Sequence, residues 1–122
     1  MADREAAFRS LVGGNIFHAE SPNGASLICL VTSVTKTTIF ARTVTTQICL
    51  EFDQQIGTAK WGDEPALCTI DSTRTLPAKI YDVMLQIDRK FGVERDLGKF
   101  KLLDTEIEAL LFVDSYYAPN IL

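Results

Sequence analysis

The sequence predicts an α+β fold: a small antiparallel meander of four or five strands, with a short N-terminal helix and two C-terminal helices packed on it. The first observation is the run Ser26–Asp53, which lacks Pro and Gly and is rich in Val, Ile, Thr and Phe, residues that favour a pleated, half-buried surface. The second is a change in apolar spacing near Thr75, from every second residue to about every 3.6 residues. In a chain of 122 residues we expect one domain, 1–122, strand-rich over 15–71 and helical over 76–118.

A short helix is predicted first, over about Arg4–Val12, because Gly13 and Gly14 follow it as a natural stop. A first strand is expected over Asn15–Glu20. The segment Ser21–Gly24 then joins it to the next strand, since its Asn-Gly pair readily takes the positive φ angles of a tight hairpin.

Three strands follow in the apolar run. Ser26–Val34 is apolar on both faces, which is typical of a strand covered on both sides, and Thr38–Val44 returns from it. Gln47–Asp53 alternates cleanly between an inward and an outward set. The inward residues are Ile48, Leu50 and Phe52, and the outward residues are Gln47, Cys49, Glu51 and Asp53. The sheet should therefore have one closed face and one face open to water.

The strand-rich part should end in a loop and one short strand. Gln54–Glu64 is polar and contains Gly, and Leu67–Asp71 follows as the last strand. Short antiparallel strands in sequence order curl most easily into a partly open barrel, because closure removes exposed edges. The strand pattern of Asn15–Asp71 resembles small SH3-like barrels, without a motif specific to them. An open sheet with the helix pair across one face is the competing geometry.

Two helices are predicted in the C-terminal part. Pro77 suits a first helical turn, and Gly92 suits a helix end. Between them an apolar stripe recurs at helical spacing, formed by Ile80, Val83, Met84, Ile87 and Phe91. In the second helix, Thr105 and Glu108 have the spacing of a capping box. Its expected apolar face contains Ile107, Leu110 and Leu111 and extends to Asp114, with Phe112 and Val113 widening it.

Composition narrows the range of functions and locations. Hydrophobic residues make up 47% and charged residues 23%, the balance of a soluble globular protein. A net charge of −4 argues against non-specific binding to nucleic acid or anionic lipid. No apolar run approaches the roughly 18 residues that span a bilayer, and the first ten residues lack the apolar segment of a secretory signal. Cys29, Cys49 and Cys68 are odd in number and widely spaced, so we expect reduced thiols, a cytoplasmic location and no membrane partner.

No catalytic, metal or cofactor site can be assembled from the sequence. His18 is the single histidine, the cysteines do not stand at ligand spacing, and no Gly-rich phosphate loop is present. Ser21 and Ser26 are near His18 only along the chain, so no nucleophile with its base is predicted. We therefore expect no catalytic residues, no metal, no cofactor and no enzyme activity.

The leading hypothesis is a non-enzymatic binding or adaptor domain whose partner is another protein or a second copy of the chain. Trp61 lies in a polar loop, and Tyr116 and Tyr117 stand before an apolar tail. Aromatic side chains anchor interfaces because they bury much area with little loss of entropy. Arg42 and Glu51 complete the candidate partner-binding residues. The tail, 118–122, would dock on its own core or on a partner.

The alternative hypothesis is a nucleic-acid-associated module. Between residues 89 and 101, five basic residues stand against two acidic ones, with aromatic residues between them. The candidate residues are Arg89, Lys90, Arg95, Lys99 and Lys101.

Overall fold

The computed structural model describes residues 7–21, 23–60, 67–94 and 101–117. The chain divides into two compact units. The strand unit contains the residues up to Thr43 and Ile48–Thr75, and the helical unit contains Val44–Gln47 and the residues from Leu76 onward. The boundary at Thr75 falls where the apolar spacing changes. The single domain expected over 1–122 stays a prediction.

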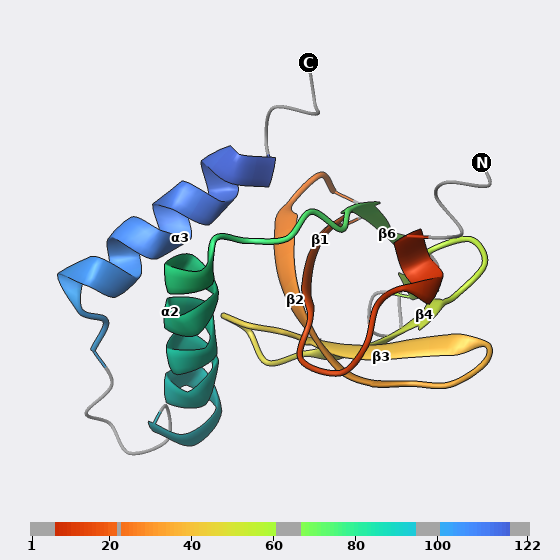
Figure 1. Cartoon of the computed structure of the whole chain (residues 1–122), viewed down its shortest axis with the longest axis horizontal. Coiled ribbons are helices and arrows are strands. Elements are labelled where there is room, and N and C mark those ends of the chain that lie inside the picture. Colours follow the sequence, from red (N-terminus) through yellow and green to blue (C-terminus); the bar gives the residue numbers. More distant parts are fainter. Residues whose placement is uncertain (1–6, 22, 61–66, 95–100, 118–122) are drawn as a thin grey trace. The chain divides into compact units, whose positions relative to one another are not determined.

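The strand unit is a six-stranded antiparallel sheet that curls into a nearly closed barrel (Figure 1). The strands are β1 (Ile16–Glu20), β2 (Ser26–Val34), β3 (Thr38–Thr43), β4 (Cys49–Asp53), β5 (Thr58–Lys60) and β6 (Leu67–Ser72). Their order in the sheet is β4-β3-β2-β1-β6-β5. Because β6 pairs back onto β1 and β4 lies beside β5, few strand edges remain open. The predicted α+β class with a barrel-like meander is confirmed.

Strand β5 is the element that the sequence did not predict, since it lies within the expected loop Gln54–Glu64. It is three residues long, too short to show an alternating pattern, and it is defined by its antiparallel pairing with β6. Ala59 of β5 is buried and stands opposite Cys68. The candidate residue Trp61 lies outside the described residues.

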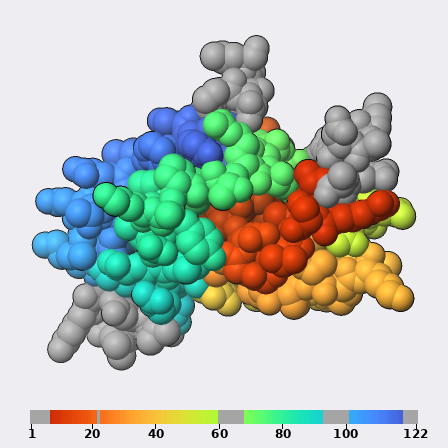
Figure 2. Space-filling model, viewed as in Figure 1, coloured from red at the N-terminus to blue at the C-terminus, as the bar shows by residue number. Residues whose placement is uncertain are grey.

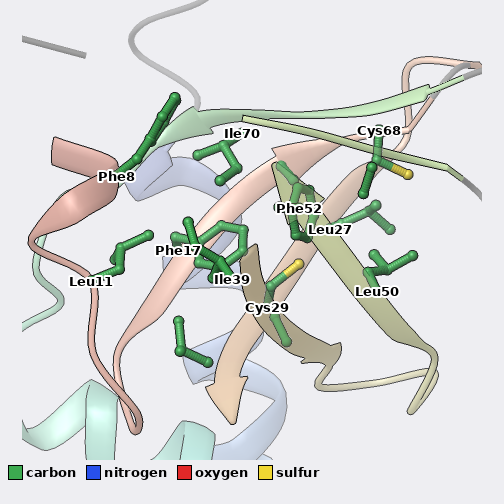
Figure 3. Close-up of a cluster of buried hydrophobic side chains, with 14 residues drawn as sticks. Phe8, Leu11, Phe17, Leu27, Cys29, Ile39, Leu50, Phe52, Cys68 and Ile70 are labelled. Atoms are coloured by element: carbon green, nitrogen blue, oxygen red, sulfur yellow. The ribbon is translucent and has the colours of Figure 1, made fainter. Parts of the chain in front are cut away.

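The inward side chains of the strands fill the barrel (Figure 3). At the centre, the rings of Phe17 and Phe52 meet edge to face, with centroids 5.2 Å apart. Leu50 and Phe52 are buried and Ile48 is partly buried, which confirms the predicted inward face of β4. The predicted outward residues Cys49, Glu51 and Asp53 are exposed.

One end of the barrel is covered by Phe8, from a short helical segment at residues 7–9. The backbone of Gly57 passes directly under this ring. A Cβ atom at Gly57 would lie 2.5 Å from Cζ of Phe8, and the residue has a φ of +72°. Glycine is required here both for the close approach and for the left-handed backbone.

The helical unit contains α2 (Ala78–Arg89), a π-helical segment η1 (Lys90–Glu94) and α3 (Asp104–Tyr117), with α3 packed against α2. In α2, Met84 and Ile87 are buried, which confirms the centre of the predicted stripe. The α-helix ends at Arg89, before the predicted stop at Gly92. From Lys90 the chain continues as the π-helical segment η1, which includes this glycine.

The turn Val44–Gln47 belongs to the helical unit. Gln47 was expected to be an outward residue at the start of a strand, and that prediction is wrong. It has a φ of 56°, in the left-handed region, and its Nε2 donates to Oδ1 of Asp88 at 2.8 Å. Asp88 is a buried residue of α2, so this amide supplies a donor that a buried carboxylate needs.

Two predictions about α3 are wrong. The helix begins at Asp104, so Thr105 is already in its first turn, and the N–H of Leu103 is capped by Glu106 instead. The predicted buried residues Ile107 and Leu111 are exposed. The buried face consists of Glu106, Ala109, Val113 and Tyr117, of which the predicted face contained Val113. Glu106 sets this orientation of the helix, because its hydrogen-bond partners lie on the α2 side.

Candidate functional site

The solvent-facing side of α3 carries large apolar side chains. Leu103, Ile107 and Leu111 have exposed fractions of 53%, 43% and 65%. Ile107 and Leu111 lie about one turn apart on α3, and Leu103 directly precedes its first residue; these three residues are here called the α3 apolar stripe. The surface of α3 is coloured blue in Figure 2. Isolated exposed apolar residues are ordinary, whereas several of them close together form a candidate contact surface.

Acidic side chains surround the α3 apolar stripe. Asp104, Glu108 and Asp114 are exposed, and α3 contains no Lys, Arg or His. The surface is therefore apolar with a negative rim. A partner with a basic rim would match it, whereas a second copy of the same stripe would bring acidic groups together.

The candidate residues Tyr116 and Tyr117 lie at the end of α3. Tyr117 is buried and Tyr116 is partly buried. The ring of Tyr116 stacks on Phe112, which is 42% exposed, with centroids 5.7 Å apart. Tyr116 can thus support a contact through Phe112, while Tyr117 packs inside the unit. The other described candidates belong to the strand unit, where Arg42 is partly buried and Glu51 is exposed.

The basic segment is only partly available for a ligand. Arg89 and Lys101 are exposed, while Arg95 and Lys99 lie outside the described residues. Lys90 is not free, because its Nζ lies 2.6 Å from Oε1 of Glu106. Among the residues predicted to bind nucleic acid, Lys90 therefore already pairs with a carboxylate of its own unit.

Glu106 is the centre of a buried polar network, here called the Glu106 network. Its carboxylate accepts hydrogen bonds from Nε2 of Gln86 at 2.6 Å, Nζ of Lys90 at 2.6 Å and the N–H of Leu103 at 2.7 Å. Burial by itself would raise the pKa of Glu106. These hydrogen bonds and the charge of Lys90 outweigh burial and lower the pKa below its usual value. The carboxylate is held ionised, with no exposed atom of its side chain.

A second network, here called the His18 network, lies in the strand unit. Nδ1 of His18 is hydrogen-bonded to Oδ1 of Asp71, and Nε2 of His18 is hydrogen-bonded to Oγ of Ser26. His18 is buried, with 5% exposed, whereas Ser26 is exposed and the side chain of Asp71 is 34% exposed. The prediction that Ser26 is near His18 only along the chain is wrong. Ser21 does not bond to His18; its hydroxyl is used within the turn, with Asn23 and Ala25.

Strand pairing places these three residues. Glu20 stands opposite Ser26 and His18 opposite Ile28, so Ser26 is the diagonal neighbour of His18. This contact could have been inferred from the hairpin register. Asp71 could not, because it comes from β6, 53 residues away in the chain. The pairing of β1 with β6 is interrupted between His18 and Ala19, where a bulge sets both Asp71 and Ser72 against His18.

The cysteines are free thiols in the described structure. Cys29 and Cys68 are buried and Cys49 is exposed. Burial raises the pKa of the Cys29 thiol, with smaller contributions from Cys68 and Asp71, and burial also raises the pKa of Cys68. Both buried thiols pack in the core of the strand unit, and the raised pKa disfavours the thiolate form.

In the described ranges, no group of three or more His, Cys, Asp or Glu side chains is placed to hold a metal ion. Among the same residues, no helix is both long and apolar enough to span a bilayer. Comparison of the chain with protein-family models, curated proteins and solved structures found no match.

Proposed function

We propose that this chain is a small protein-binding domain that docks through the α3 apolar stripe. The observation that carries the proposal is the exposure of Leu103, Ile107 and Leu111, up to 65% for Leu111. Apolar surface in water costs about 25 cal/mol per Å², so a partner that covers these side chains gains free energy. Phe112, stacked on Tyr116, is a further exposed apolar residue of α3 outside the stripe.

The charges around the stripe narrow the class of partner. With Asp104, Glu108 and Asp114 exposed on a helix without basic residues, the matching partner is a protein with an apolar patch rimmed by Lys or Arg. The acidic rim disfavours nucleic acid at this surface, because phosphates would be repelled. It also disfavours a homodimer formed stripe against stripe, although a second copy remains an outcome of the test.

The cellular setting is part of the proposal. We place the protein in the cytoplasm, where the free thiols Cys29, Cys49 and Cys68 would stay reduced. The likeness of the strand unit to SH3-like barrels belongs to the proposal as well. In this view the barrel is the stable platform, and α3 supplies the docking surface.

Capture of partners from an extract of the protein's own cells tests this function. Leu111→Glu places a charge in the stripe and should reduce the captured partners at least tenfold. Thr105→Glu adds the same charge at an exposed position of α3 outside the stripe and should leave capture unchanged. Circular dichroism should show the same helix content in both variants. Equal capture by wild type and Leu111→Glu would contradict the proposal.

Two further measurements separate the alternatives. Nuclease treatment of the extract should leave the partners bound; loss of all partners would favour the nucleic-acid module, with Arg89 and Lys101 as its described exposed residues. Light scattering should give the 13.5 kDa monomer. A dimer that Leu111→Glu dissociates would show instead that the stripe binds a second copy.

A further inference from the structure

We propose that Ser26, His18 and Asp71 form a nucleophilic serine site that reacts with activated acyl compounds such as carboxylic esters. The site lies in the strand unit and does not depend on the α3 apolar stripe. The order of hydrogen bonds carries the inference: hydroxyl to imidazole and imidazole to carboxylate. This is the arrangement by which a serine is activated as a nucleophile in general.

The carboxylate of Asp71 determines the tautomer of His18. An ionised carboxylate only accepts hydrogen bonds, so Nδ1 of His18 carries the hydrogen that is donated to Oδ1. The other ring nitrogen, Nε2, then carries no hydrogen and accepts the hydroxyl hydrogen of Ser26 with its lone pair. Each group thus has the proton state that a base-activated nucleophile needs.

Exposure differs along the network in the way that such a site requires. The side chain of His18 is 6% exposed, so the protein holds its orientation and little water can compete for its hydrogen bonds. Ser26 is an exposed residue at the start of β2, so the site opens toward solvent at this residue. Asp71 comes from the bulge in β6, and bulges re-aim side chains and occur frequently beside active sites.

The reaction follows from these positions. Oγ of Ser26 forms a bond to the ester carbonyl carbon, the carbonyl π electrons move to oxygen, and the hydroxyl proton passes to Nε2 of His18. The imidazolium is stabilised by Asp71. The electron pair on the oxyanion then re-forms the carbonyl as the bond to the alcohol oxygen breaks. The alcohol leaves with the electron pair of that bond and the proton from Nε2, and an acyl ester remains on Ser26. Water, activated by His18 in the same way, releases the carboxylic acid and restores the serine.

A fluorophosphonate probe tests the site directly, because it forms an Oγ–phosphorus bond with an activated serine and releases fluoride. Intact mass spectrometry should show one added group, and peptide mapping should place it on Ser26. Ser26→Ala should abolish the label. Ser33→Ala is the matched control, since Ser33 is another exposed serine of β2, and it should label like wild type.

The positions of His18 and Asp71 are tested by the labelling rate. His18→Gln should slow labelling about 100-fold, the usual effect of removing a general base. Since His18 is buried, this variant could fail to fold; Asp71→Asn changes a partly exposed side chain and should also slow labelling at least tenfold. In the wild-type chain, p-nitrophenyl acetate should leave an acetyl group on Ser26.

A purely structural His18 network gives a different result. In that case the variants change stability, but Ser26 reacts no faster than Ser33 in the wild-type chain, and the proposal is overturned. Ser26→Ala should leave partner capture through α3 unchanged, so failure of this site and failure of the docking function are distinguishable. The expectation that the chain is not an enzyme stays a prediction, which this experiment decides.

Discussion

The Glu106 network and the His18 network, one in each unit, bury titratable side chains in opposite ways. The carboxylate of Glu106 has no exposed atom and is surrounded by Gln86, Lys90 and the N–H of Leu103. His18 is also buried, but its network ends at Ser26, which is an exposed residue. A network closed on all sides can stabilise a fold and orient a helix. A network with one reactive end in water can also carry chemistry, and should contribute less to stability.

The largest effect is expected from Lys90→Met. Removal of the ammonium group leaves the Glu106 carboxylate buried with its main countercharge lost, which costs about 3 kcal/mol. The free energy of unfolding in urea, measured for wild type and variant, gives this value. Lys101→Met removes an exposed lysine side chain of the same unit and should change stability by less than about 0.5 kcal/mol. Equal effects of the two substitutions would show that the Glu106 network is not a closed, stabilising one.

The pH dependence of stability should report the same carboxylate. The pKa of Glu106 is lowered in the folded state from its ordinary value of 4.5, so the unfolded chain binds its proton first as the pH falls. The stabilisation is complete above that ordinary value and is lost as the pH drops through the lowered folded pKa. Glu106→Gln removes this titration. Urea unfolding across the acidic range should therefore show a smaller pH dependence for Glu106→Gln; identical slopes would contradict the prediction.

A smaller effect is expected at Gln47, whose amide bonds to buried Asp88. Gln47→Ala removes this donor and should cost about 1–2 kcal/mol. Gln47→Gly also removes the donor but relieves the left-handed backbone at φ 56°, so it should cost about 1 kcal/mol less than the alanine variant. Thermal unfolding of the pair separates the two contributions. A glycine variant less stable than the alanine variant would show that the backbone there is not strained.

The smallest effect is expected from Ser26→Ala. Ser26 is an exposed residue and water can replace its hydroxyl as a partner of His18, so the loss of stability should stay below about 1 kcal/mol. Urea unfolding of this variant beside Lys90→Met tests the comparison of the two networks. If Ser26→Ala and Lys90→Met lower the free energy of unfolding equally, the two networks contribute equally to stability, and the predicted difference between them is wrong.

The sequence could not predict the His18 network as a whole, although part of the signal was present. The spacing of His18 and Ser26 across a tight hairpin is local, and the register with Glu20 opposite Ser26 makes them diagonal neighbours. Asp71 reaches them only because β6 returns to pair with β1, and a bulge then turns two of its residues toward His18. Pairing between distant strands leaves no mark on either strand alone.

The exposure of the α3 apolar stripe could not be predicted from the sequence, for a different reason. Ile107 and Leu111 are apolar at helical spacing, so periodicity predicts that they are buried. The helix instead turns Glu106 inward, because Lys90 and Gln86 can satisfy its carboxylate there. A pattern of hydrophobic residues does not record that a charged residue has partners on another helix. The inward position of Glu106 leaves the apolar side chains of Ile107 and Leu111 at the surface.

The sequence by itself determined the α+β class with an antiparallel meander, the bounds of β2, the inward residues of β4 and the buried centre of the α2 stripe, while barrel or open sheet stayed undecided. These features follow from periods of two and about 3.6 residues, which local backbone geometry imposes on any strand or helix. Only the tertiary structure decided the pairing of β5, the rotation of α3 and the meeting of Ser26, His18 and Asp71. Each depends on partners brought from distant parts of the chain, and the free energy of those contacts is absent from any local pattern.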